Sequence, residues 1–245
     1  RNIKRKTVNQ IVNVPIPNKD RKIETTYNQL TISLTNNFDV IFRAYNDGIA
    51  YRINDKRSKP KNVIYEKMSL EFPNEASAYF PWEESMYSHN ERLYNHIEIS
   101  KLKDSDFCSL PVLIETDNGK VLFTESSLQN YPGMFLEKQQ NNNLISKFPN
   151  YVLKAIPAAS YDSENVEGSD RTEDIVEEGN FIAKISGERN LPWRVFIISD
   201  DDRTFVESNL VTILSGKSKI EDTSWIKPGK VAWDWWNANN IYGVD

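Results

Sequence analysis

The residues best suited to chemistry lie near the end of the chain, in the segment VAWDWWN. Its period-2 alternation predicts a strand in which Trp233 and Trp235 share one face, while Asp234 and Trp236 share the other. Aromatic rings stack on the C–H faces of sugar rings, and Asp234 and Asn237 can hydrogen-bond to neighbouring hydroxyls. The same tryptophans could equally pack between two domains. The pattern therefore predicts a carbohydrate-binding surface or a domain junction, and leaves both open.

A second candidate is Glu125, in the segment KVLFTESSLQNYPGM. If Val121 and Phe123 face the core, the period-2 rule places Glu125 on the same face, where its strand ends. A carboxylate that leaves an apolar face must be ion-paired, hydrogen-bonded or bound to a cation. Ser126 and Gln129 have capping-box spacing, which predicts one short helical turn that would hold Glu125 in place. The residues alone allow a salt-bridge partner as well as a metal ligand or catalytic acid.

Other chemistry-bearing residues form weaker patterns. His89 and His96 lie in a polar segment without further ligands at usable spacing, so both are expected to be surface histidines. Arg194, in the segment LPWRVFIIS, is expected to pair with a buried acid and to have a structural role. The sequence has no Ser-His-Asp order, glycine-rich phosphate loop or HExxH motif. Spacing alone assigns no pair of carboxylates to glycoside hydrolysis.

Composition excludes several classes of protein. The 245 residues carry a formal net charge of −5, which argues against a nucleic-acid surface, and the basic start RNIKRK is expected to be a frayed, solvated terminus. Cys108 is the only cysteine, which excludes an internal disulfide and a cysteine-rich metal site. No stretch approaches the roughly 20 apolar residues of a membrane span. The charged start does not resemble a signal peptide.

The elements that would position these residues are short strands. Residues 27–35 alternate apolar and polar side chains, and residues 39–53 and 111–126 each predict a hairpin with a tip at Asn46-Asp47-Gly48 or Asp117-Asn118-Gly119. No long amphipathic helix is expected. These signals predict an all-β protein, a large β-sandwich. Further strands are expected within residues 62–72, 151–159, 180–186, 191–199 and 204–214, and irregular segments within 73–90, 137–150 and 160–180.

The composition changes near the end of the chain. A polar segment is followed by WIKPGK, with a turn at Pro228-Gly229, and then by the strand-like VAWDWWN. This change predicts a boundary between a sandwich domain, residues 1–224, and the start of a new unit, residues 225–245.

Four segments in this order, FRAYNDGIAYRI, FTESSLQNYPGMFLE, LPWRVFIIS and SWIKPGKVAWDWWN, resemble glycoside hydrolase family 97. The resemblance runs from about Tyr27 to the end of the chain. The family comprises α-glycosidases in which an N-terminal β-super-sandwich precedes a catalytic (β/α)8 barrel. The resemblance implies that residues 1–224 form most of the N-terminal domain, incomplete at its own N-terminus, and that residues 225–245 contain the first barrel strand. It also implies that the domain packs against its own barrel.

The resemblance assigns roles to the two candidate segments. The family binds calcium at the barrel mouth with one glutamate from the N-terminal domain, and the position of Glu125 implies that it is this ligand. A barrel carries its active site at the C-terminal ends of its strands. Trp233, Asp234, Trp235, Trp236 and Asn237 would then lie at the sugar pocket. The catalytic carboxylates of the family lie on later barrel strands, so no catalytic residue is expected in this chain.

The function that the resemblance implies is that of a calcium-dependent, exo-acting α-glycosidase in the periplasm, acting on oligosaccharides. The segment WDWWN is closer to the retaining α-galactosidases of the family than to its inverting α-glucosidases, which stay an alternative. A different alternative is a non-catalytic carbohydrate-binding β-sandwich, and a third is a structural β domain.

Overall fold

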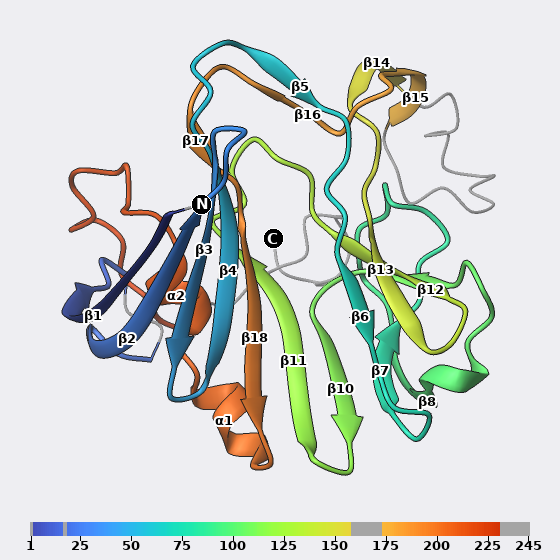
Figure 1. Cartoon of the computed structure of the whole chain (residues 1–245), viewed down its shortest axis with the longest axis horizontal. Helices are drawn as coiled ribbons and strands as arrows, with labels where there is room; N and C mark the ends of the chain where they lie inside the picture. Colours follow the sequence, from blue (N-terminus) through green and yellow to red (C-terminus); the bar gives the residue numbers. More distant parts are fainter. Residues whose placement is uncertain (1, 17–18, 158–172, 231–245) are drawn as a thin grey trace, which may run out of the picture. The chain divides into compact units, whose positions relative to one another are not determined.

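The computed structural model describes residues 2–16, 19–157 and 173–230 (Figure 1). Within these ranges the chain is built almost entirely from strands, and no helix is long and apolar enough to cross a membrane. In chain order the elements are β1 (Asn2–Asn13), β2 (Lys22–Ser33), β3 (Phe38–Tyr45), β4 (Gly48–Asp55), β5 (Lys61–Val63), β6 (Ser69–Glu71), β7 (Ser77–Pro81), β8 (Tyr94–Glu98), the 3-10 helix η1 (Ile99–Lys101), β9 (Phe107–Cys108), β10 (Val112–Thr116), β11 (Gly119–Ser126), β12 (Phe135–Gln139), β13 (Asn143–Lys147), β14 (Val152–Pro157), β15 (Glu173–Glu178), β16 (Ala183–Ile185), β17 (Arg189–Asn190), β18 (Trp193–Ser199), α1 (Asp202–Glu207) and α2 (Leu210–Leu214).

The chain divides into two compact units. The first comprises residues 1–9 and 26–216, and the second comprises residues 10–25 and 217–245. In the described part of the second unit, the Val14 N–H donates to the Arg21 carbonyl at 2.9 Å, and the Trp225 indole N–H donates to the Asp222 carbonyl at 3.1 Å. The apolar core cluster of the sandwich and all the buried ionic groups discussed below belong to the first unit.

The largest sheet of the described residues has ten strands. Nine of them follow the order β1-β2-β3-β4-β18-β11-β10-β7-β8, and β17 pairs with β4 beside this path. Figure 1 shows β18 between β4 and β11, so a strand from late in the chain joins two early hairpins. A second sheet has the order β6-β13-β12-β9, and two-stranded ribbons pair β14 with β15 and β5 with β16.

The core lies between the ten-stranded and four-stranded sheets. Phe80, Ile114 and Phe123 from the large sheet, with Leu136 and Leu144 from the small one, belong to one cluster and have no exposed surface. Two sheets that bury one face each against a shared apolar core form a β-sandwich. The predicted fold class is therefore confirmed for the described residues, while the predicted first barrel strand lies outside them.

Both predicted hairpins are confirmed. Tyr45 pairs with Gly48, so Asn46 and Asp47 form the two-residue loop between β3 and β4. Thr116 pairs with Gly119, whose φ of 127° lies in the region that only glycine adopts readily. Two-residue loops of this composition fix the register of the strands they join. This register decides which side chains of β11 face the core.

Several predicted elements differ from the structure. Residues 204–214 are predicted to form a strand, but they contribute to α1 and α2. The Asp201 side chain caps α1 by accepting from the Arg203 N–H, and the buried residues of α2 are Leu210, Ile213 and Leu214. This i, i+3, i+4 spacing is helical, and it extends over too few residues to be recognised as a period.

The remaining differences concern pairing between distant segments. Residues 2–6 of the basic start are exposed, as expected, but they belong to strand β1 rather than to a frayed end. Residues 62–72 form two short strands, β5 and β6, in place of one. The segments expected to be irregular contain β7, β13 and β15. Each of these strands pairs with another strand, and the alternation of apolar and polar residues along its own segment does not indicate that pairing.

Candidate functional site

The candidate site lies where β11 and β18 run side by side. Glu125 of β11 and Arg194 of β18 are directly opposite each other in the ladder. Residues directly opposite each other on neighbouring strands point to the same face of the sheet, and so do residues two positions apart on one strand. Both side chains therefore lie on the same face as Phe123 and Phe196, which are also opposite each other. The core-facing position that the sequence predicts for Glu125 is therefore confirmed, and Arg194 provides its partner.

Arg194 is the centre of a buried ionic cluster. Its side chain is 1% exposed, while the side chains of Glu66 and Glu125 are 8% and 10% exposed. The guanidinium donates from Nε to Glu66 Oε1 at 2.8 Å and from Nη2 to Glu66 Oε2 at 2.7 Å. Its third nitrogen, Nη1, donates to Glu125 Oε1. The predicted pairing of Arg194 with a buried acid is thus confirmed, and it involves two acids.

The loop after β11 completes the hydrogen bonds of the cluster. The Met134 backbone N–H donates to Glu125 Oε2 at 3.0 Å, and the Tyr131 hydroxyl donates to Glu66 Oε2 at 2.9 Å. The predicted helical turn after Ser126 is not formed. The Ser126 hydroxyl donates to the Val211 carbonyl at 2.7 Å, and Ser127 has a φ of 62°, outside the right-handed helical region. Glu125 is held by the loop, although by a backbone N–H and not by a capping box.

Burial and charge act in opposite directions on these groups. Burial raises the pKa of Glu125, and the charge of Arg194 partly offsets this rise. For Arg194, burial lowers the pKa, but its two carboxylate partners outweigh burial and raise it above its ordinary value. Burial and the nearby Glu66 charge raise the pKa of Tyr51 to about 12. With both acids ionised, the cluster of Glu66, Arg194 and Glu125 has a net charge of −1.

Two surface hollows flank different parts of the large sheet. One, of about 580 Å³, is lined by the Glu66 and Tyr131 members of this site and by Tyr51, Tyr65 and Asp55 among others. Of the cluster's three charged residues, Glu66 is the one that lines this hollow. Apolar residues from β3 and β4, Phe38, Val40 and Ile53, make up much of its wall.

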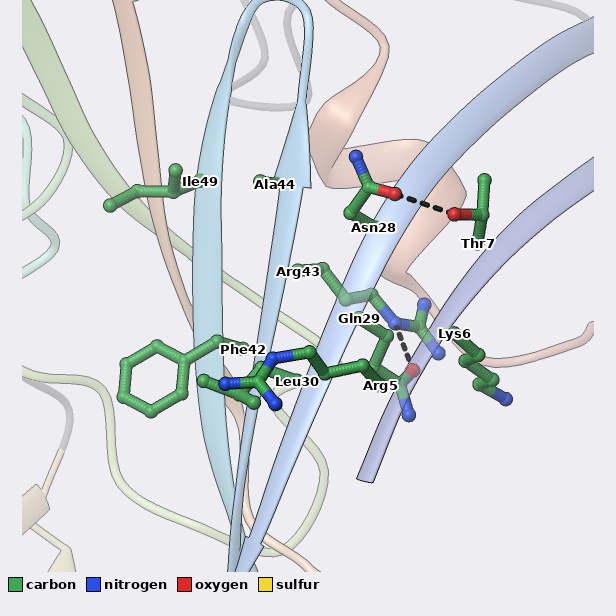
Figure 2. Close-up of a pocket in the computed structure, with 10 residues that line it drawn as sticks. All are labelled: Arg5, Lys6, Thr7, Asn28, Gln29, Leu30, Phe42, Arg43, Ala44 and Ile49. Carbon is green, nitrogen blue, oxygen red and sulfur yellow. Dashed lines mark hydrogen bonds between the residues drawn. The ribbon is translucent and has the colours of Figure 1, made fainter. Parts of the chain in front are cut away.

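The second hollow, of about 650 Å³, lies on strands β1 to β4 (Figure 2). Leu30, Phe42 and Ile49 provide apolar surface, and Arg5 extends across Leu30 toward Phe42. Hydrogen bonds join Thr7 to Asn28 at 2.7 Å and Arg43 to Gln29 at 3.1 Å. Its lining contains no carboxylate, so it lacks the acid and base that glycoside hydrolysis requires.

A calcium ion at this site would need ligands from other parts of the protein. No group of three or more His, Cys, Asp or Glu residues that could hold a metal exists within the described ranges. Calcium takes about six to eight oxygen ligands. Each oxygen of Glu125 accepts one hydrogen bond and retains a lone pair, and the net charge of the cluster is negative. Glu125 therefore fits as one calcium ligand, and not as a complete site.

The other sequence-predicted residues have different outcomes. Trp233, Asp234, Trp235, Trp236 and Asn237 lie outside the described residues, so their assignment to a sugar pocket stays a prediction.

The surface position expected for His96 is confirmed. Its side chain is 52% exposed, and its Nε2 lies 2.8 Å from Glu115 and 3.0 Å from the Ser77 hydroxyl. Sequence reasoning missed Glu66, which lies in a segment predicted to be a strand and binds a partner 128 positions away.

Together, the two packed sheets and the Glu66–Arg194–Glu125 cluster define a β-sandwich domain with a buried ionic site. Residues 1–216 match the family described as glycosyl-hydrolase 97 N-terminal, and the chain belongs to glycoside hydrolase family 97. The match ends at the residue that also closes the first compact unit.

The curated relatives that this chain matches are much longer than it. It is 34% identical over 253 residues to the retaining alpha-galactosidase of Bacteroides thetaiotaomicron, an alignment that covers 98% of this chain and 37% of that protein. It is 26% identical over 200 residues to a probable retaining alpha-galactosidase of Streptomyces bingchenggensis, which covers 81% of this chain and 26% of that protein. The alignments thus span between about a quarter and just over a third of the length of these relatives.

Solved structures share the fold. A glycoside hydrolase family 97 enzyme from Pseudoalteromonas sp. strain K8, in complex with acarbose, has a TM-score of 0.72 at 16% identity, covering 94% of this chain and 32% of that chain. A beta-arabinopyranosidase has a TM-score of 0.57 at 16% identity, covering 85% of this chain and 33% of that chain.

Proposed function

We propose that this chain is the N-terminal part of an exo-acting, retaining α-galactosidase that removes terminal α-linked galactose from oligosaccharides in the periplasm. The observation that supports this proposal is the 34% identity to a retaining alpha-galactosidase over 98% of the chain. In a retaining mechanism, one carboxylic acid protonates the leaving oxygen while a carboxylate attacks the anomeric carbon. Those carboxylates would belong to the (β/α)8 barrel that this domain packs against.

We also propose that Glu125 supplies one carboxylate ligand to a calcium ion of the full-length enzyme. The two oxygens of Glu125 are oriented by Arg194 and by the Met134 N–H, and each retains a lone pair. Calcium bound there would polarise sugar hydroxyls and organise the carboxylates around them. The domain's own contribution is to hold Glu125 in a fixed, partly desolvated position, because a preoriented ligand loses little freedom when the ion binds.

The sugar contacts would come from the C-terminal segment. We propose that Trp233, Trp235 and Trp236 provide stacking surface and that Asp234 and Asn237 hydrogen-bond to hydroxyls. This chemistry suits a monosaccharide ring with an apolar face and several vicinal hydroxyls.

The test is an assay of the full-length enzyme on p-nitrophenyl α-galactoside and α-glucoside, with and without EDTA. We expect faster cleavage of the galactoside and loss of that activity with EDTA. Faster cleavage of the glucoside would replace the proposed substrate with the glucosidase alternative. If neither substrate is cleaved with calcium present, a non-catalytic carbohydrate-binding sandwich becomes the better interpretation.

A further inference from the structure

Glu66 binds the side of the Arg194 guanidinium that suits a bidentate carboxylate. It accepts from Nε and from Nη2, the two nitrogens that form the fork for a bidentate carboxylate. Glu125 receives only the remaining Nη1, through a single oxygen. Since an arginine engages one carboxylate best through its fork, Glu66 prevents Arg194 from engaging Glu125 in this way.

The consequence for Glu125 is electrostatic. An arginine paired with Glu125 alone would form a neutral pair, and such a pair attracts a cation weakly. With Glu66 present, the guanidinium charge is shared between two carboxylates, and the cluster has a net charge of −1 when both are ionised. All three side chains are at most 10% exposed, so water screens this charge only weakly.

Tyr131 and Phe148 hold Glu66 and Arg194 in place. The Tyr131 hydroxyl donates to Glu66 Oε2 at 2.9 Å, and the Phe148 ring centre lies 5.5 Å from the guanidinium carbon of Arg194. Tyr131 packs in a second apolar cluster with Ile182 and Leu191. Glu66 therefore has a fixed position, although it lies on a segment between the short strands β5 and β6.

We infer that Glu66, acting through Arg194, is a positioning residue that limits the arginine to one hydrogen bond with Glu125 and keeps the cluster negatively charged, so that Glu125 can bind a cation. This inference rests on the proposed role of Glu125 in calcium binding. Glu66 itself is a partner of the arginine and not a ligand of the ion.

The test compares calcium affinities of the full-length enzyme, measured by isothermal titration calorimetry after treatment with EDTA, for Glu66→Gln, Glu66→Asp and Glu125→Gln. The Glu66→Gln substitution keeps one acceptor but removes the charge, which frees Arg194 to engage Glu125 and makes the cluster neutral. We expect the calcium Kd to rise by about tenfold or more, the effect of removing a unit charge close to a divalent ion in a weakly screened site. Glu66→Asp keeps the charge and should recover most of the affinity.

The matched control is Glu115→Gln, which removes a carboxylate from the neighbouring strand β10. Glu115 pairs with Lys120 at 3.0 Å and with His96, away from the cluster. We expect its calcium Kd to equal that of the wild type. A second variant, Tyr131→Phe, removes one hydrogen bond to Glu66 without changing the charge of the cluster, and it should raise the Kd by less than Glu66→Gln does.

The outcomes separate this inference from the proposed function. If Glu125→Gln weakens calcium binding and a folded Glu66→Gln does not, the inference is overturned while the calcium role of Glu125 stands. If Glu125→Gln leaves the Kd unchanged, the proposed calcium role fails, and the inference fails with it. If the Glu66→Gln variant does not fold, the calcium Kd of the Glu66→Asp variant tests the inference. A calcium Kd within threefold of wild type supports the role of the charge, and a Kd as high as that of Glu125→Gln overturns it.

Discussion

At the scale of single residues, the buried cluster shows how one arginine can hold two carboxylates inside a sandwich. Removing three charges from water has a large desolvation cost, which the attraction between them offsets only when the geometry is good. Here all three guanidinium nitrogens donate to a carboxylate oxygen, and further donors come from Tyr131 and Met134. The cluster is consequently more sensitive to the loss of the arginine than to the loss of either acid.

Arg194→Met should be strongly destabilising, because it leaves Glu66 and Glu125 buried without their counter-ion. Breaking a buried ion pair by removing one partner costs about 3–5 kcal/mol. The measurement is the free energy of opening from hydrogen exchange at the amides of β11 and β18 in the full-length enzyme. Arg203→Met is the control, since the side chain of Arg203 is 82% exposed in its pair with Asp201. Equal effects of the two substitutions would show that the cluster contributes little to stability.

A buried acid outside the cluster, Asp55, predicts a pH dependence of stability. Hydrogen bonds from Arg57, Nε to Oδ1 at 2.9 Å and Nη2 to Oδ2 at 2.7 Å, lower the pKa of Asp55 to about 2 from its ordinary value of 3.8. Because the folded-state pKa is depressed, this stabilisation is present above about pH 4 and is lost as the pH falls toward 2.

Asp55→Asn should therefore lose more stability at pH 5 than at pH 3. The expected difference is at most about 1 kcal/mol, since Arg57 is partly exposed and its interaction is screened. Denaturant unfolding of wild type and variant at the two pH values measures it, and Arg57→Gln should reproduce the trend. A stability difference that does not change with pH would contradict the assignment to Asp55.

The sequence predicts some of these residues and not others, for physical reasons. Glu125 and Arg194 lie in apolar segments that are predicted to be strands, so their need for partners can be predicted locally. Glu66 cannot be recognised in this way, because its importance comes from a partner that the fold brings to it across 128 positions. Trp233 and its neighbours are predicted from composition and resemblance, and lie outside the described residues.

At the scale of elements, hairpins are predictable from the sequence and short helices are not. The turn residues Asn46-Asp47 and Asp117-Asn118 act locally, so they indicate the loops without knowledge of the fold. The segment 204–214 contains β-branched and aromatic residues typical of strands, yet it forms α1 and α2. Its conformation is decided by a cap at Asp201 and by the hydrogen bond from the Ser208 hydroxyl to Asp47, 2.7 Å long.

Gly48, the first residue of β4, must be glycine because its neighbours leave no room for a Cβ. A Cβ at Gly48 would lie 2.1 Å from the Phe196 carbonyl oxygen and 2.9 Å from Leu210 Cδ1. Since the carbonyl belongs to the neighbouring strand, relief would require moving the ladder between β4 and β18. Gly48→Ala should therefore destabilise the domain by about 2–3 kcal/mol, as overpacking in a core does.

Hydrogen exchange at the β4 and β18 amides measures this loss, with Gly229→Ala as the control, because a Cβ at Gly229 would have no described neighbour within 4 Å. A Gly48→Ala protein as stable as the control would mean that α2 and β18 adjust at little cost.

At the scale of the whole molecule, the described residues form a β-sandwich, and the proposed function requires that the calcium and sugar sites be completed by other parts of the full-length enzyme. Among the described residues, no group of three or more His, Cys, Asp or Glu could hold a metal, and Glu125 fits as one calcium ligand within the pair of buried carboxylates held by Arg194. The family match covers residues 1–216, and the alignment covers 37% of the retaining alpha-galactosidase relative. The proposed function therefore assigns the catalytic carboxylates and the remaining calcium ligands to other parts of the full-length enzyme. Recognition of the sugar ring is then expected of the segment 233–237.

The sugar-pocket prediction can be separated from the domain-junction alternative with one isosteric substitution. Asp234→Asn keeps the size of the side chain but removes the charge and one acceptor, so it should weaken hydrogen bonds to galactose hydroxyls while leaving packing intact. We expect kcat/KM of the full-length enzyme for p-nitrophenyl α-galactoside to fall by about 10- to 100-fold, which corresponds to about 1.4–2.7 kcal/mol of transition-state stabilisation.

The thermal midpoint and the calcium affinity should stay at their wild-type values, because Asp234 is not proposed as a ligand of the ion. Asp222→Asn, in an exposed turn where Asp222 accepts from the Ser224 N–H at 2.9 Å, is the matched control and should leave kcat/KM unchanged. If Asp234→Asn lowers the thermal midpoint while kcat/KM per folded molecule is unchanged, the segment packs between domains and the sugar contacts lie elsewhere. If kcat/KM falls at constant stability, the tryptophans on either side of Asp234 become the next residues to test for stacking.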